Sequence, residues 1–130
     1  MTKNNKNVTV ICEENCGNAP KKLLLLELMT HLVNGEISLF LEWLTDKVQW
    51  RFVGKHQLSG IEEVQNTLTE KLALSIDMLH IHHIITHGNV ASLNGTLTLT
   101  NGDKLEFCHV YRFSGFGKEA KIKEITSYII

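Results

Sequence analysis

Residues 90–113 read VASLNGTLTLTNGDKLEFCHVYRF, and this stretch decides the fold. Apolar and polar side chains alternate on both sides of Asn101-Gly102, which is the pattern of two half-buried strands joined by a tight turn. On the first strand, alternation places these side chains on the apolar face: Ala91, Leu93, Leu97 and Leu99. The stretch therefore predicts an antiparallel hairpin with one buried face.

The length of the turn determines which side chains of the second strand face the core. A two-residue Asn101-Gly102 loop would pair the threonines of the first strand with leucine and phenylalanine, and would bury hydroxyl groups. We therefore expect a three-residue loop with Gly102 in the left-handed bulge position, which sets Leu97 opposite Leu105. One face of the second strand then carries Leu105, Phe107, His109 and Tyr111. In this register His109 points into the core.

The rest of the C-terminal half continues the hairpin pattern. Strand-like runs lie at about 76–87, 90–100, 104–114 and 120–130, and glycine-containing turns separate them at 88–89, 101–102 and 114–117. Consecutive hairpins predict an antiparallel meander. An earlier strand is predicted by Val48, Trp50 and Phe52, which alternate with polar residues.

The N-terminal half has the spacing of helices instead. Asn18 and Pro20 mark the start of a first helix that ends at Asn34-Gly35, and its apolar positions are Leu25, Leu28, Met29 and Leu32. A second, short helix is expected from Glu36 to about Thr45-Asp46, with Ile37, Phe40, Leu41 and Leu44 on one face. Ser59-Gly60-Ile61-Glu62 resembles a capping box that starts a third helix, with the apolar stripe Ile61, Val64 and Leu68. Helices followed by strands predict an α+β fold, with three N-terminal helices packed on a curved antiparallel sheet.

Length and charge narrow the range of functions. The 130 residues suit one domain, which we place at 18–130. Residues 1–17 are expected to form a polar N-terminal tail or a short extra strand, since Val8 to Ile11 are strand-like. Thirteen basic and fourteen acidic residues give a net charge of -1, so we expect neither nucleic acid nor a membrane as partner. The polar N-terminus predicts a cytoplasmic protein. The cysteines Cys12, Cys16 and Cys108 are odd in number and lack CxxC spacing, so we expect reduced thiols.

Four segments carry a resemblance to a known family: VNGEISLFLEWLTDKVQW (33–50), LSGIEEV (58–64), ITHGNVASLNG (85–95) and CHVYRFSG (108–115). Together with the order of the elements over residues 20–130, they resemble the nuclear transport factor 2-like superfamily, in particular its SnoaL-like and ketosteroid-isomerase-like branch. The resemblance implies a cone-shaped barrel with a pocket between helices and sheet, and usually a dimer. The same cone serves isomerases, cyclases, dehydratases and epoxide hydrolases, and also proteins without catalytic activity, so fold alone does not choose the function.

The isomerase machinery of that family is mostly missing from this sequence. Leu28 stands where the resemblance implies a tyrosine, and Arg51 or Phe52 stands where it implies the aspartate base. None of these side chains shuttles a proton at neutral pH. The second aspartate of the family corresponds to His109, which is titratable. We therefore expect no ketosteroid isomerase activity and no cofactor.

Three histidines share one predicted strand. Side-chain alternation puts His80 and His82 on one face and His83 on the other. A two-residue turn at 88–89 would direct His80 and His82 into the interior, whereas the apolar pattern of the strand would direct His83 there. We expect His83 to face the interior. A His-x-His pair can chelate zinc, but no third ligand appears at a suitable spacing, so no metal site is predicted.

These considerations define the candidate site and two functions. The candidate catalytic residues are His109 and His83, and the candidate ligand-binding residues are Trp50, Arg51, Tyr111, Leu28, Phe107 and Leu97. The first function is a non-catalytic pocket or dimerisation module that takes a small apolar molecule as ligand. The alternative is an enzyme that moves protons on a small apolar carbonyl compound. A homodimer is expected through the outer face of the sheet, which offers Thr96, Thr98, Val110 and Tyr128.

Overall fold

The computed structural model describes residues 8–13, 19–71, 76–117 and 119–130. Their helices and strands are, in chain order, β1 (Thr9–Cys12), α1 (Pro20–Val33), α2 (Ile37–Leu41), β2 (Leu44–Phe52), β3 (His56–Ser59), α3 (Ile61–Lys71), β4 (Ile76–His87), β5 (Val90–Leu99), β6 (Lys104–Phe113) and β7 (Ile122–Ile129). The predicted α+β class is confirmed. The strand β1 includes Thr9 to Ile11 of the strand-like run Val8 to Ile11, for which the sequence left tail and strand open.

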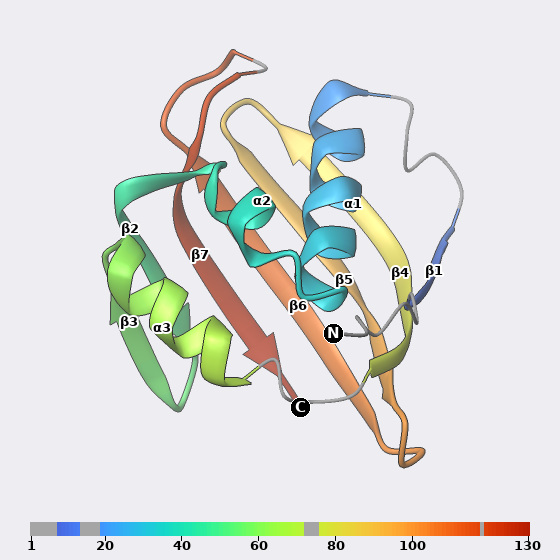
Figure 1. Cartoon of the computed structure of the whole chain (residues 1–130). Coiled ribbons are helices and arrows are strands. Elements are labelled where there is room, and N and C mark those ends of the chain that lie inside the picture. The colour runs from blue at the N-terminus through green and yellow to red at the C-terminus, as the bar shows by residue number, and fades with distance from the viewer. Residues whose placement is uncertain (1–7, 14–18, 72–75, 118) are drawn as a thin grey trace.

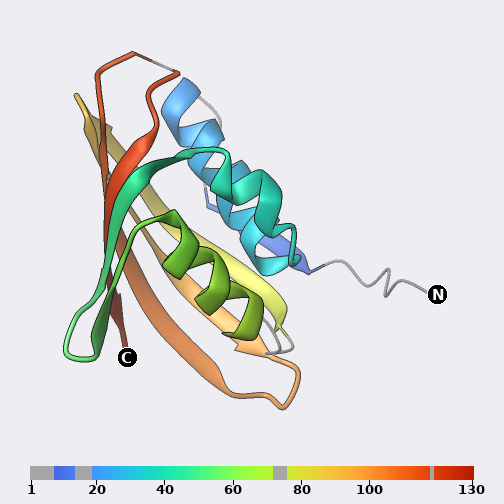
Figure 2. The ribbon, with the colours of Figure 1, turned by 60° about the vertical axis from the view of Figure 1, so that its left-hand side comes forward.

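All described strands belong to one curved sheet with the order β1-β4-β5-β6-β7-β2-β3. The sheet is open, because β1 and β3 form its two edges and do not pair with each other. The three helices lie on one face of the sheet and leave the other face uncovered (Figures 1 and 2). We call these the inner and the outer face. The helices are not consecutive at the N-terminus, since β1 precedes α1, and β2 and β3 lie between α2 and α3.

The β5–β6 hairpin has the predicted register. Leu97 lies opposite Leu105, and Gly102 has a φ of 95° in the left-handed region. Backbone hydrogen bonds from Gly102 to Leu99 and from Leu99 to Asp103 close the three-residue loop at 2.9 and 2.8 Å. The inner face of the hairpin therefore carries Ala91, Leu93, Phe107, His109 and Tyr111, all buried. This confirms the predicted direction of His109.

Two local predictions around α2 and α3 are corrected, and the structure adds one strand. The helix α2 ends at Leu41, not near Thr45-Asp46, because Leu44 starts β2 and pairs with Ile122 of β7. The loop before the third helix contains β3, a short edge strand that pairs with β2. Glu63, rather than Glu62, caps α3, and its carboxylate accepts a hydrogen bond from the Ser59 N–H at 2.6 Å.

The N-terminal edge is fixed by short contacts. The strand β1 pairs in parallel with β4, and the Val8 N–H donates to the Asn34 side chain at 2.8 Å. Cys12 is disulfide-bonded, so the expectation of a reduced thiol is wrong for this residue, while Cys108 is free and Cys16 lies outside the described residues. An odd number of cysteines without CxxC spacing still allows one bridge. No helix in the described ranges is long and apolar enough to cross a membrane.

Candidate functional site

A buried polar cluster lies on the inner face where β6, β7 and β2 run side by side. Ser127 of β7 pairs with His109 of β6 on one side and with Phe52 of β2 on the other. The Trp50 Nε1–H donates to Ser127 Oγ at 2.8 Å, and Ser127 Oγ lies 2.6 Å from His109 Nδ1. Ser127 is 1% exposed and His109 7% exposed. We call Trp50, His109 and Ser127 the inner triad.

The donors and acceptors of the inner triad settle the tautomer of His109. Ser127 Oγ accepts the indole N–H, and His109 Nδ1 is the one acceptor described for its own hydroxyl proton, so this proton is assigned as donating to Nδ1. The proton of the neutral imidazole is then on Nε2. Burial lowers the pKa of His109 from 6.5 to about 4, so the ring is neutral at pH 7.

Aromatic rings and aliphatic side chains fill the space around His109. The centroids of Phe107, Tyr111 and Trp50 lie 4.9, 6.0 and 6.4 Å from the His109 ring. The Tyr111 hydroxyl donates to the Met29 sulfur of α1 at 3.6 Å, and burial raises its pKa, with Cys108 as a smaller cause. The helix α1 thus packs directly on the aromatic side chains of the inner face.

The structure brings together most of the predicted ligand-binding residues. Leu28, Trp50, Phe107 and Tyr111 are buried in the core, and Leu97 is half-buried against it. Arg51 is exposed, as expected for a strand charge, and lies apart from this group. These residues pack against one another. His109, Trp50 and Tyr111 do not line the hollow beside Ile85 and Tyr128, the hollow beside Lys22 and His82, or the hollow beside Trp43 and Lys121.

The inner triad lacks the parts of an acid–base site. No carboxylate contacts His109 in the described part of the chain, so no acid orients the ring or stabilises its charged form. Ser127 resembles a nucleophile paired with a base, but it is fully buried and its oxygen already accepts the Trp50 N–H. The hydrogen bonds therefore hold β2, β6 and β7 in place.

The buried state of His109 predicts a pH-dependent stability. Unfolding exposes the ring, which then takes up a proton below about pH 6.5, whereas the folded protein takes it up only near pH 4. Stability should therefore fall as the pH falls through this window, by about 2 kcal/mol between pH 7 and pH 5. Urea unfolding at both pH values measures the loss. His109→Phe should show a smaller loss than the parent, and equal losses in both proteins would contradict the burial of a neutral ring.

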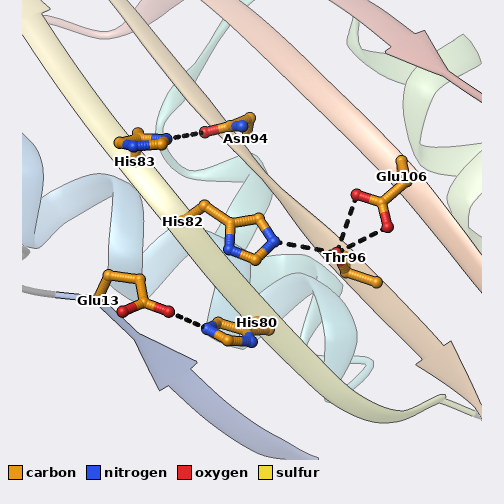
Figure 3. Close-up of polar contacts among 7 residues, drawn as sticks. All are labelled: Glu13, His80, His82, His83, Asn94, Thr96 and Glu106. Carbon is orange, nitrogen blue, oxygen red and sulfur yellow. Dashed lines mark hydrogen bonds and ion pairs between the residues drawn. The ribbon is translucent and has the colours of Figure 1, made fainter.

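The prediction that His83 faces the interior is wrong. His83 is exposed on the outer face, where its Nδ1 lies 3.1 Å from Asn94 Oδ1. A β-bulge between Ile81 and His83 shifts the alternation of β4. Because of it, Leu79, Ile81 and Ile84 are all buried, and the three histidines all lie on the outer face (Figure 3). Neither strict alternation that the sequence suggested describes this strand.

The outer face has an apolar hollow of about 430 Å³. Ile85 is 61% exposed and Tyr128 47% exposed there, and Ile130 and Cys108 also line it. Polar side chains surround these residues: His83, Ser92, Asn94 and Glu106. Large apolar side chains are thus concentrated on the uncovered face of the sheet.

Sequence reasoning missed two residues that matter. Ser127 joins the inner triad because β7 lies between β6 and β2, and the parallel β2–β7 pairing leaves no local signal. Glu13 lies beside His80 although 67 residues separate them, because β1 pairs with β4. Only the strand order reveals both neighbours.

No protein-family model and no curated protein matches the sequence. Solved structures do match. A nuclear transport factor 2-like protein of unknown function from Cytophaga hutchinsonii ATCC 33406 is 21% identical, with 83% of this chain and 97% of that chain covered and a TM-score of 0.61. A protein assigned as a SnoaL-like polyketide cyclase from Shewanella denitrificans OS-217 is 10% identical over 85% and 90% of the two chains, with a TM-score of 0.72.

A third match is the epoxide hydrolase/cyclase-like enzyme SalBIII, which has a role in pyran ring formation in the polyether salinomycin. It is 13% identical over 88% of this chain and 93% of that chain, with a TM-score of 0.72. The fold is therefore that of the nuclear transport factor 2-like superfamily, with SnoaL-like proteins among its structural neighbours, as the sequence predicted. At these identities the likeness defines the fold and leaves the function open.

Proposed function

We propose that the protein is a non-catalytic module that forms a homodimer through the outer face of its sheet. The closed interior supports this function most: Leu28, Trp50, Phe107, Tyr111 and the helix α1 occupy the space in which a pocket would lie. A catalytic cone needs an open cavity with a titratable group exposed to it. Here the one titratable group of the inner triad is neutral and hydrogen-bonded to Ser127.

The outer face supports the choice of a second copy as partner. Its exposed apolar residues Ile85 and Tyr128 have mostly uncharged neighbours. Glu106 is the one carboxylate among the residues that line the hollow. An isologous interface places the same patch on both subunits, so a patch with few like charges can pair with itself. The helices already cover the inner face, whereas the exposed apolar residues of the outer face would be buried only by a partner.

Tyr128→Glu and Ile85→Glu should dissociate the dimer. The two-fold axis brings each new carboxylate into the apolar patch of the partner, where burial of a charge is unfavourable. We expect the dimer dissociation constant to rise at least about tenfold, a loss of about 1.4 kcal/mol. Sedimentation velocity at high micromolar protein measures the mass of each variant.

Leu39→Glu is the matched control, because Leu39 is 42% exposed on α2, on the helix side of the molecule. It should remain dimeric. A monomeric parent at high micromolar concentration would contradict the dimer. A dimer that dissociates in Leu39→Glu and persists in Tyr128→Glu would place the interface on the helices.

The second candidate function is binding or proton transfer on a small apolar carbonyl compound. One observation favours it: with Nδ1 bound to Ser127, the Nε2–H of His109 has no hydrogen-bond acceptor among the described residues. This donor could bind a carbonyl oxygen if α1 moved away from the sheet. Such a ligand should bind the parent and be lost from His109→Phe.

The cytoplasmic location belongs to the same proposal, and the disulfide at Cys12 provides its test. Cytoplasmic thiols are kept reduced in most organisms. Alkylation of the protein at the moment of cell lysis therefore reports the compartment: label on Cys12 would show that the disulfide is open in the cell, as a cytoplasmic location requires. An unlabelled Cys12 would indicate an oxidising compartment.

A further inference from the structure

Three side chains on the outer face converge at the edge of the sheet, away from the inner triad. Glu13 follows β1, and His80 and His82 lie on β4 (Figure 3). One ligand atom from each of the three lies within 4.8 Å of the others. His80 Nε2 already makes a short hydrogen bond to Glu13 Oε2, and the two imidazole rings have centroids 4.5 Å apart. We propose that Glu13, His80 and His82 form a zinc-binding site.

The type of ligand favours zinc over other common cations. Two imidazoles and one carboxylate form a set that binds Zn²⁺ with a fourth position open to water, whereas Mg²⁺ and Ca²⁺ prefer oxygen ligands throughout. Tetrahedral zinc needs its ligand atoms about 3.3 Å apart. The side chains must therefore move by about 1 Å. They have room to do so, because all three are at least partly exposed. Zinc would replace the proton that His80 and Glu13 now share.

A hydrogen-bond chain orients His82 for this role. The Thr96 hydroxyl has one proton and lies 2.9 and 3.0 Å from the two oxygens of Glu106, to which it donates. Thr96 Oγ1 therefore accepts the Nε2–H of His82 at 3.1 Å. The Nδ1 atom of His82 keeps its lone pair and faces the side on which Glu13 and His80 lie (Figure 3). Histidine ligands of metals are commonly fixed by such a second hydrogen bond.

The backbone brings the ligands together before any metal binds. The Glu13 N–H donates to the Ile81 carbonyl at 3.0 Å, which continues the β1–β4 pairing and places Glu13 beside His82. Regular alternation around the buried Ile81 puts both histidines on the outer face. Lys22 also lines the adjoining hollow, where the carboxylate of Glu13 lies as well. Bound zinc would link the edge strand β1 to β4.

Zinc titration of the metal-free protein by calorimetry tests the site, without reductant because a free thiolate also binds zinc. The parent should bind one Zn²⁺ per chain. His80→Ala, His82→Ala and Glu13→Gln should each weaken binding at least about tenfold, and Thr96→Val about tenfold through the loss of orientation. His83→Ala is the matched control, since His83 lies on the same strand outside the cluster, and should bind as the parent does.

A second readout separates loss of the site from loss of the fold. Zinc should raise the melting temperature of the parent and of His83→Ala, and should leave that of His82→Ala unchanged. Circular dichroism of the metal-free variants should match the parent. The proposal would be overturned if the parent bound zinc no more tightly than His82→Ala does, or if Glu13→Gln kept the affinity of the parent. It would also be overturned if His83→Ala lost as much zinc affinity as His82→Ala. None of these outcomes depends on dimer formation.

Discussion

Gly95→Ala is expected to destabilise the protein by about 3 kcal/mol or more. A Cβ at Gly95 would lie 2.2 Å from the backbone oxygen of His80, and 3.1 Å from the His80 carbonyl carbon and the Ile81 Cα. These atoms belong to the main chain of β4, so no change of rotamer relieves the overlap. The strand must move, and His80 and the adjacent bulge at His82 and His83 move with it.

Chemical denaturation of the two proteins measures this loss, and Gly117→Ala is the control. A Cβ at Gly117 meets no atom within 4 Å and needs no positive φ, so this variant should keep the stability of the parent within about 0.5 kcal/mol. Gly95→Ala should also weaken zinc binding. A stable Gly95→Ala protein would show that β4 and β5 lie farther apart than described.

Ser127→Ala is expected to cost about 2–5 kcal/mol in the free energy of unfolding, because it removes one oxygen that serves two buried partners. The Trp50 Nε1–H loses its acceptor, and His109 Nδ1 loses its donor. Each buried polar group left without a partner costs about 1–3 kcal/mol. Urea unfolding at pH 7, where His109 is neutral, gives the value directly.

A double-mutant cycle with His109→Phe assigns the loss to the triad. When Ser127→Ala is made in the His109→Phe protein, it removes only the hydrogen bond to Trp50. It should therefore lower the free energy of unfolding by about 1–2 kcal/mol less there than it does in the parent. Ser92→Ala on the outer face of β5 is the control and should change little. Additive losses, or a loss below about 1 kcal/mol for Ser127→Ala, would contradict the hydrogen bonds of the inner triad.

The sequence predicts those parts of the fold that depend on local pattern. The hairpin register at Leu97 and Leu105 follows from alternation together with Gly102, because a shift by one residue would bury threonines. The helix α1 follows from its apolar spacing and from Pro20 at its start. Burial of His109 follows from that register alone.

Other parts of the structure depend on partners that are distant in the sequence. The strand β3 has one buried side chain, Leu58, so it shows no alternation, and its pairing with β2 creates it. Residues 44–46 form strand rather than helix because Leu44 pairs with Ile122, about 80 residues away. The bulge in β4 reverses the expected direction of His83, and the residues it pairs with, Asn94 and Gly95, lie on another strand.

The candidate site shows the same division. Burial of Leu28, Trp50, Phe107 and Tyr111 follows from apolar character, but a list of buried residues does not separate a pocket lining from a filled core. That difference depends on how closely α1 packs against the sheet. The roles of Ser127 and Glu13 cannot be predicted from the sequence, because their partners are distant along the chain. The pairing of β1 with β4 and of β7 with β2 brings them together.

Native mass spectrometry of the purified protein tests the central claim most directly, since one spectrum reports both the number of chains and any bound small molecule. A module with a closed interior that pairs through its outer face should give twice the mass of the chain, with no additional mass other than bound zinc. After denaturation, the mass of one unmodified chain should remain. A single chain that carries a small organic molecule, released on denaturation and absent from His109→Phe, would contradict the account and identify His109 as part of a ligand pocket.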